Sequence, residues 1–267
     1  HLERFNAGDH FGAVAEVVRA ESISRVLYPN DATEAGQELR LRQEYFFVSA
    51  SLQDLLRRHL NQHATLTDLS EHAAIQMNDT HPSIAVAELM RQLIDNHNIP
   101  WDTAWKITVG TLGYTNHTLL PEALETWSVG LMERMLPRHM QIIYLINAQH
   151  IDTLRAKGVD DVNVLRAVSL IEEDNGRRVR MGDLAFLGSH SVNGVSALHT
   201  QLMRKTVFAE LHKIYPERIN NKTNGITFRR WLFQANPKLT EMLVESLGED
   251  VLDNAETRLK ELEPFAE

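Results

Sequence analysis

The chain has no cysteine among its 267 residues, which excludes disulfide bonds and thiolate metal sites. No stretch resembles a secretion signal, and no apolar run is long enough to span a bilayer. Basic runs are also lacking and the net charge is −9, so nucleic acids and anionic membranes are poor partners. The nucleotide motifs GxGxxG and Walker A and the zinc motif HExxH are absent. These absences favour a cytoplasmic protein.

What is present is a 43% share of hydrophobic residues, enough for a sizeable core, in which apolar runs stop abruptly at polar clusters. These clusters are Asn78-Asp79-Thr80-His81, Thr115-Asn116-His117-Thr118, Ser189-His190 and Asn224-Gly225. We interpret each as the carboxyl end of a buried strand. Because ligands bind beyond the carboxyl ends of strands in open α/β sheets, the four ends are expected to converge on one cleft.

Helical patterns alternate with these strands, which predicts a helix-rich, doubly wound α/β fold. The expected helices are 5–27 with Asp9 as its N-cap, 38–59, 82–96, 105–112 capped by Asp102, one that begins after Pro121 and ends near 136, 137–157 ended by Gly158, 195–204, and everything beyond 228. The expected strands are 73–77, 114–116, 184–188 and one that leads to Asn224, with a hairpin of 170–173 and 177–181 around Asp174-Asn175-Gly176.

The polar side chains at the strand ends suit a ligand that is rich in hydroxyl groups. They are Asp79, His81, His117, Glu122, His190 and Asn224. Carboxylates, imidazoles and amides donate to and accept from sugar hydroxyls, and Tyr28 could add a stacking surface. For each residue alone, a helix cap or a hydrogen bond to buried backbone is the simpler interpretation. A metal site of the metallophosphoesterase kind is an alternative, although the second carboxylates that it needs are not evident.

His59 and His63, one helical turn apart, form a separate pair that could hold a metal ion. Such a pair is more often part of a solvated helix face.

The chain resembles the α-glucan phosphorylases, the family of glycogen, starch and maltodextrin phosphorylases, and the bacterial type in particular. The resemblance covers essentially the whole chain. Its motifs are RVLYPND, LRLRQEYFFV, AIQMNDTHPSIAVAELMR, YTNHTLLPEALETW, LPRHMQIIYLIN, SHSVNGVSALH and NKTNGITFRRW. Several of these runs exceed ten residues and follow in the order of the family, which makes a chance match negligible.

The resemblance implies a two-domain GT-B-type glycosyltransferase. Residues 1–227 would be the latter part of the N-terminal glucan-binding and catalytic domain, and residues 228–267 the first helices of the C-terminal cofactor-binding domain. Such enzymes cleave the terminal α-1,4-linked glucose of a glucan with phosphate and release glucose 1-phosphate with retention of configuration. Pyridoxal phosphate supplies its phosphate as the acid and base partner of the substrate phosphate. A homodimer through the starting helix is also implied.

The resemblance also implies roles for single residues. His117 and Asn224 would hold the 6-hydroxyl of the scissile glucose. Asp79 and His81 would line the acceptor channel together with Glu122, and Tyr28 would be a platform for a more distant sugar. Asp31 would belong to a mobile gate with Arg40 as a partner, and Trp231 would lie near the cofactor. Ala32-Thr33 stands where the animal enzymes have Asn-Phe, so their inhibitory block is not expected. Phe228 replaces the usual proline after NGIT.

The lysine that binds the cofactor is expected outside this chain. Together with a first residue, His1, that is not methionine, this predicts an internal fragment that does not catalyse by itself. A non-catalytic module for glucan binding or dimerisation is the alternative function.

Overall fold

The computed structural model describes residues 2–174 and 176–266. The chain packs as two compact units that meet between Lys222 and Thr223, and we call them unit 1 and unit 2 in chain order. Residues 221–227 at this boundary are exposed. No helix in the described part of the chain is long and apolar enough to cross a membrane.

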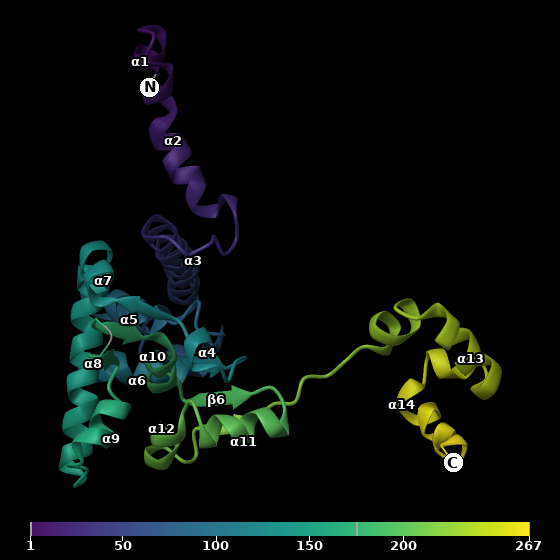
Figure 1. Ribbon diagram of the computed structural model, residues 1–267. Helices are drawn as coiled ribbons and strands as arrows, with labels where there is room; N and C mark the ends of the chain where they lie inside the picture. Colours follow the sequence, from purple (N-terminus) through teal and green to yellow (C-terminus); the bar gives the residue numbers. More distant parts are fainter. Residues whose placement is uncertain (1, 175, 267) are drawn as a thin grey trace. The chain divides into compact units, whose positions relative to one another are not determined.

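Unit 1 is built on a parallel sheet of four strands (Figure 1). The strands are β1 (Ile75–Asn78), β2 (Leu112–Thr115), β6 (Ser191–Gly194) and β7 (Ile219–Asn221), in that spatial order. Asn78 lies opposite Thr115, and Thr115 lies opposite Asn193, so the carboxyl ends are aligned at one edge. The prediction of a helix-rich α/β fold with a parallel sheet is confirmed.

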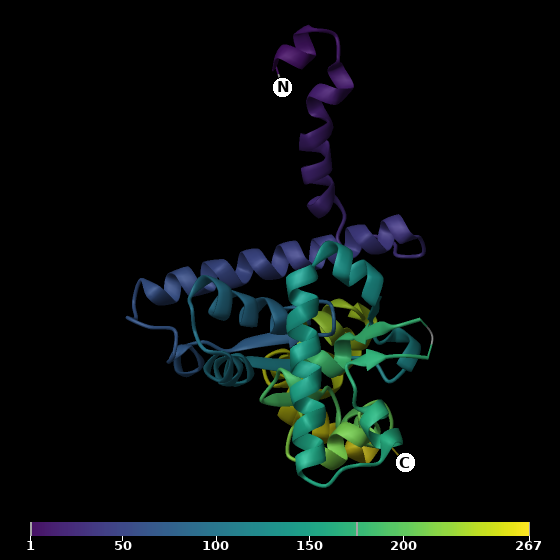
Figure 2. The same cartoon turned by 90° about the vertical axis from the view of Figure 1, so that its left-hand side faces the viewer.

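Helices connect the strands and cover the sheet, as parallel strands require. They are α1 (Leu2–Asn6), α2 (His10–Arg25), α3 (Glu34–Leu60), α4 (Leu69–His72), α5 (Ala85–Arg91), the π-helical η1 (Gln92–Asn96), α6 (Trp101–Thr111), the 3₁₀ turn η2 (Pro121–Ala123), α7 (Val129–Met135), α8 (Pro137–Ala156), α9 (Val162–Ala167), α10 (Met181–Leu187), α11 (Ala197–Lys205) and α12 (Ala209–Ile214). Figure 2 shows α3 as one long unbroken helix. α6 and α10 contact β2, and α11 contacts β6 and β7.

A second, smaller sheet is antiparallel, with the order β3 (Thr126–Ser128), β5 (Arg178–Arg180) and β4 (Ile171–Glu172). Val179 pairs with both Trp127 and Ile171 in its centre. The two strands of the predicted hairpin are confirmed, while Asn175 of its predicted turn lies outside the described residues. β3 was not predicted from the sequence, because three residues carry too little alternation to be distinguished from a helix.

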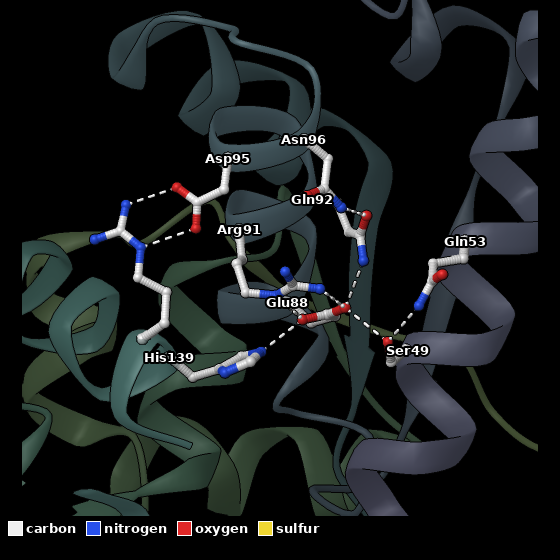
Figure 3. A network of polar contacts seen from close by, with 9 residues as sticks. Ser49, Gln53, Glu88, Arg91, Gln92, Asp95, Asn96 and His139 are labelled. Carbon is white, nitrogen blue, oxygen red and sulfur yellow. Dashed lines mark hydrogen bonds and ion pairs between the residues drawn. The ribbon is translucent and has the colours of Figure 1, made fainter.

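A buried polar network around Glu88 joins α3, α5, η1 and α8 (Figure 3). The Glu88 side chain is fully buried. It accepts hydrogen bonds from Ser49 on α3 at 2.8 Å, from Gln92 at 2.8 Å, and from His139 on α8 at 2.5 Å. Arg91 adds a bidentate pair at 2.8 and 2.9 Å. In Figure 3, Ser49 and His139 approach the carboxylate from opposite sides, so this one residue links two long helices.

Several predicted boundaries need correction. The run 184–188 is not a strand: residues 184–187 belong to α10, a helix that is buried on all sides, and Gly188 is its C-cap. The predicted helix 5–27 divides into α1 and α2, and Asp9 does cap α2 by accepting from the Gly12 N–H. α3 begins four residues earlier than predicted because the Thr33 hydroxyl caps it. Asp102 lies in the first turn of α6 and is not its cap.

Unit 2 is a small helical body. Its elements are the π-helical η3 (Arg229–Gln234), α13 (Pro237–Leu247), the 3₁₀ turn η4 (Glu249–Leu252), α14 (Ala255–Arg258) and the 3₁₀ helix η5 (Leu259–Phe265). Leu243, Leu247 and Val251 form its core. The prediction that the chain is helical beyond residue 228 is confirmed.

Candidate functional site

The end of β1 holds Asp79 in an unusual backbone conformation. Its φ of +67° lies in the left-handed region, which few residues other than Gly, Asn and Asp adopt. Two hydrogen bonds retain this conformation. The Asp79 N–H donates to the Thr115 carbonyl over 3.0 Å, and the Thr80 N–H donates to Asp79 Oδ1 over 2.6 Å. Because strained residues concentrate at binding and catalytic sites, the structure also marks Asp79 as a candidate binding residue.

The end of β2 is tied to both of its neighbouring strands. His117 follows this strand, and its Nε2–H donates to Oδ1 of Asn78, at the end of β1, over 2.5 Å. Asn116 is fully buried, and its Oδ1 accepts from Nε2 of His199, on α11, over 3.0 Å. Because Nδ1 of His199 already accepts the Val195 N–H, the proton of this ring is on Nε2. Burial, helped by the nearby His117, lowers the pKa of His199 and keeps it neutral.

Tyr28 is presented at this edge from the loop before α3. Its φ is +54°, which is unfavourable for a bulky residue. Gln43 of α3 stabilises the loop, because its Oε1 accepts the Tyr28 N–H and its Nε2 donates to the carbonyls of Ile23 and Val26, all within 3.0 Å. The Tyr28 ring then lies 4.6 Å, centroid to centroid, from the ring of His81. The segments that precede α3 and follow β1 are thereby brought together.

The charges near His81 show which residues share this edge. Burial lowers the pKa of His81, the carboxylate of Asp79 acts in the opposite direction, and the charges of Arg40 and His117 lower it again. A ring held neutral in this way can both donate and accept a hydrogen bond. Asp79, His81 and His117 therefore share one electrostatic environment.

Arg40 is the centre of a cluster of acidic groups. It forms an ion pair with Asp31 at 2.9 Å and approaches Glu44 at 3.6 Å and Glu125 at 3.7 Å. The side chains of Glu44 and Glu125 are only 5% and 10% exposed. Burial, together with the charge of Glu125, raises the pKa of Glu44, and burial also raises the pKa of Glu125. The Arg40 side chain is itself only 19% exposed, so it lies mostly within this cluster.

The whole sequence, residues 1–267, matches the model of the carbohydrate phosphorylase family. The chain belongs to this family. It is 51% identical over 266 residues to a glycogen phosphorylase of Synechocystis sp., covering 100% of this chain and 31% of that relative. It is 49% identical to the liver form of bovine glycogen phosphorylase and 47% identical to the human brain form, in each case over 99% of this chain and 32% of the relative. The chain therefore spans about a third of the length of these relatives.

Two other residues that the sequence singled out in unit 1, Glu122 and His190, are not part of the Arg40 cluster or of the ends of β1 and β2. Glu122 is exposed in η2, whereas Glu125, three residues later, is the carboxylate that reaches Arg40. His190 precedes β6, and its Nδ1 contacts the Val109 carbonyl at 3.1 Å, so it belongs to the amino edge of the sheet. Asn224 and Trp231 belong to unit 2, and their places beside His117 and the cofactor stay predictions.

Four residues of this phosphorylase edge escaped the sequence interpretation: Gln43, Glu44, Glu125 and His199. Each lies within a motif that carries the family resemblance, yet none follows a strand directly. The sequence feature that could have indicated Glu44 and Glu125 is their charge, because both are acidic residues in segments that bury them. This feature identifies a site only when the fold shows that the two carboxyl groups are neighbours.

The hydrolase alternative needs clustered metal ligands at the strand ends. Among the residues that the structure describes, the ligand atoms close enough to share a metal ion belong to His59, His63 and Asp68. His59 and His63 lie near the end of α3, about 28 Å along its axis from Arg40 at 1.5 Å per residue. The edge itself presents hydrogen-bonding groups and an aromatic ring, which are groups that can bind a hydroxyl-rich ligand.

Proposed function

We propose that the protein of which this chain is part is an α-glucan phosphorylase. It cleaves the terminal α-1,4-linked glucose of a glucan with inorganic phosphate and releases glucose 1-phosphate with retention of configuration. The observation that carries the proposal is the grouping of Asp79, His81 and His117 at one sheet edge, in a chain that belongs to the phosphorylase family.

His117 is the residue to which we assign the central role. Its Nε2–H donates to Asn78, so in this tautomer Nδ1 is the ring nitrogen that can accept a hydrogen bond from a ligand. An acceptor fixed in this way suits the hydroxyl group of a glucose unit. Asp79 and His81 would bind hydroxyl groups of the neighbouring sugar, and Asn224 would donate its amide to the same hydroxyl as His117.

Tyr28 and Asp31 would control access to the glucan. The Tyr28 ring, 51% exposed, offers an apolar face on which a pyranose ring can stack. Asp31, on the same loop, is held by Arg40 at 2.9 Å. Exchange of this ion pair for contacts with substrate would let the loop move as a gate.

Pyridoxal phosphate is the cofactor that we propose for the intact enzyme, where it would supply a phosphate group for proton transfer. Of the residues described here, only Trp231 was expected near it, and this side chain is 67% exposed. The part that we assign to the chain's own residues is to bind and orient the glucan.

The replacement His117→Ala in the intact enzyme tests the function. Removal of one preorganised hydrogen-bonding group costs about 10²–10³ in kcat, so phosphate-dependent release of glucose 1-phosphate should fall by that factor. His190→Ala is the matched control, since it removes an imidazole at the opposite edge of the sheet, and it should keep wild-type turnover. Wild-type turnover in His117→Ala would contradict the proposal.

We also propose that the intact protein is a homodimer that makes contact through α2. Phe11, Val17 and Val18 are 91%, 46% and 58% exposed, and Ala13 alone is buried in this helix. Figures 1 and 2 both show α2 extending away from the sheet of unit 1. A second copy of the same helix is the partner that we assign to this surface.

A further inference from the structure

Three histidines and one aspartate gather where α3 ends. His59 and His63 come from the last turn of α3 and the residues after it, Asp68 immediately precedes α4, and His72 is the last residue of α4. The sequence indicated only the pair His59 and His63. The fold adds the other two by turning the chain back after Leu60.

The ligand atoms of this cluster are already close together. Those of His59, His63 and Asp68 all lie within 4.8 Å of one another. Asp68 is the centre: its Oδ1 is 3.0 Å from Nε2 of His59, and its Oδ2 is 3.8 Å from Nδ1 of His63 and 3.6 Å from Nε2 of His72. Ligand atoms bound tetrahedrally to zinc at 2.0–2.1 Å are separated by about 3.4 Å. The observed separations are close to that value.

The histidine rings are stacked on one another. The ring of His63 lies 4.3 Å from that of His59 and 3.9 Å from that of His72, measured between centroids. A bound metal ion would use the lone pairs of these ring nitrogens, so a cluster of this kind suits such an ion.

Burial and charge around the cluster fit a cation. The His59 side chain is 4% exposed, whereas those of His63 and Asp68 are 27% and 30% exposed, so the cluster is closed on one side and open on the other. A cavity of about 240 Å³ gives access to the rings of all three histidines.

One cationic side chain lies beside the cluster. Arg58 also lines the cavity, and its guanidinium is paired with Asp54 at 2.9 Å. Arg57 shares this carboxylate at 2.7 Å, so the charge of Arg58 is compensated in part.

We propose that His59, His63 and Asp68 bind a divalent transition-metal ion of the zinc class, with His72 as the fourth ligand. Imidazole and carboxylate ligands suit Zn²⁺, Co²⁺ and Ni²⁺ and do not suit Mg²⁺. The ion would fasten the end of α3 to the start and end of α4. Its distance from Arg40 along α3 makes it a stabilising site that is separate from the glucan edge.

Zinc titration of the intact protein, after treatment with EDTA, tests this site by calorimetry. The wild type should bind one zinc equivalent more than the double variant His63→Ala/Asp68→Asn, and His63→Ala alone should weaken the site at least tenfold. His97→Ala removes an exposed histidine that is not part of the cluster and should leave binding unchanged. Equal stoichiometry and affinity in the wild type and the double variant would overturn the proposal.

Two further measurements keep the test independent of folding defects. His63 and His72 are partly exposed, so their replacement should preserve the far-ultraviolet circular dichroism spectrum, which buried His59 need not do. Cobalt substitution should give visible ligand-field bands in the wild type that are weaker or shifted in His72→Ala. Identical bands in both would remove His72 from the ligand set, and bands retained in the double variant would refute the site.

Discussion

At the residue scale, one arginine serves three carboxyl groups. Arg40 pairs with Asp31 in the loop and approaches Glu44 and Glu125 in the interior. The charges of Asp31 and Asp79 also act on Glu125. A single guanidinium cannot compensate so many negative charges, and the pKa values of both buried glutamates are raised. The site therefore stores electrostatic strain beside the strained backbone of Tyr28 and Asp79.

Glu44→Gln should relieve this strain in alkaline solution. The pKa of Glu44 is raised above its ordinary 4.5, so the folded state binds more protons than the unfolded state and the wild type loses stability as the pH rises above 4.5. One unit of pKa corresponds to about 1.4 kcal/mol. We therefore compare the difference in Tm, Glu44→Gln minus wild type, at the two pH values. This difference should be at least roughly 2 °C larger at pH 8.5 than at pH 5.

Thermal unfolding followed by circular dichroism at the two pH values measures this difference. Glu122→Gln, at an exposed carboxylate, is the control and should follow the wild type at both. A Glu44→Gln curve parallel to that of the wild type would show that the buried pair does not exchange protons on folding.

The sequence predicted those residues of the edge that directly follow a strand, such as Asp79 and His117. His199 could not, because its role depends on a buried partner, Asn116, that lies 83 positions earlier. Glu122 and Glu125 show the same limit. Both are acidic residues of one motif, and only the packing of β3 against β5 determines which of them turns inward.

At the scale of elements, the sequence predicted long amphipathic helices well and short buried segments poorly. The expected helix 137–157 agrees with α8 to within one residue, since it shows many turns of period and ends before Gly158, whose φ is +82°. The run 184–188 was misassigned because every residue of α10 is buried, so it shows no periodicity. The true strand, β6, begins after His190 and contains polar residues.

The Glu88 network is the clearest test of how the helices are held together. Burial opposes ionisation of Glu88, but hydrogen bonds from Arg91, His139, Gln92 and Ser49 hold its pKa far below the ordinary 4.5. The contribution of ionised Glu88 to the free energy of unfolding is therefore complete above pH 4.5 and is lost as the pH falls below that value. Glu88→Gln should lower stability at pH 7 by about 3 kcal/mol, since Arg91 loses its buried counter-charge.

Urea unfolding of the wild type and Glu88→Gln at pH 7 and at pH 3.5 checks this expectation. The difference should shrink at the lower pH, whereas the exposed control Glu217→Gln should resemble the wild type at both. An unchanged midpoint for Glu88→Gln at pH 7 would mean that the network contributes no net stability.

At the scale of the whole molecule, the exposed α2 is the feature that a single copy leaves unexplained. Burial of a phenylalanine side chain contributes about 1.5–3 kcal/mol, so Phe11→Glu should weaken a dimer through α2 at least tenfold. Sedimentation velocity of the intact protein over a concentration series measures the change. Val162→Glu is the control, because Val162 is 74% exposed and lies outside α2, and it should leave the sedimentation unchanged. A Phe11→Glu protein that sediments like the wild type would exclude this interface.

The spatial order of the large sheet, β1-β2-β6-β7, is also the order of its strands along the chain. During synthesis, each new strand can therefore dock on the outer edge of those already made, and none has to be inserted between two earlier partners. A nascent polypeptide that has emerged as far as Gly194 already contains β1, β2 and β6, and with the first two of these strands Asp79 and His117. Ribosome-bound intermediates of this protein can thus form the sheet edge that bears both residues before β7 is translated.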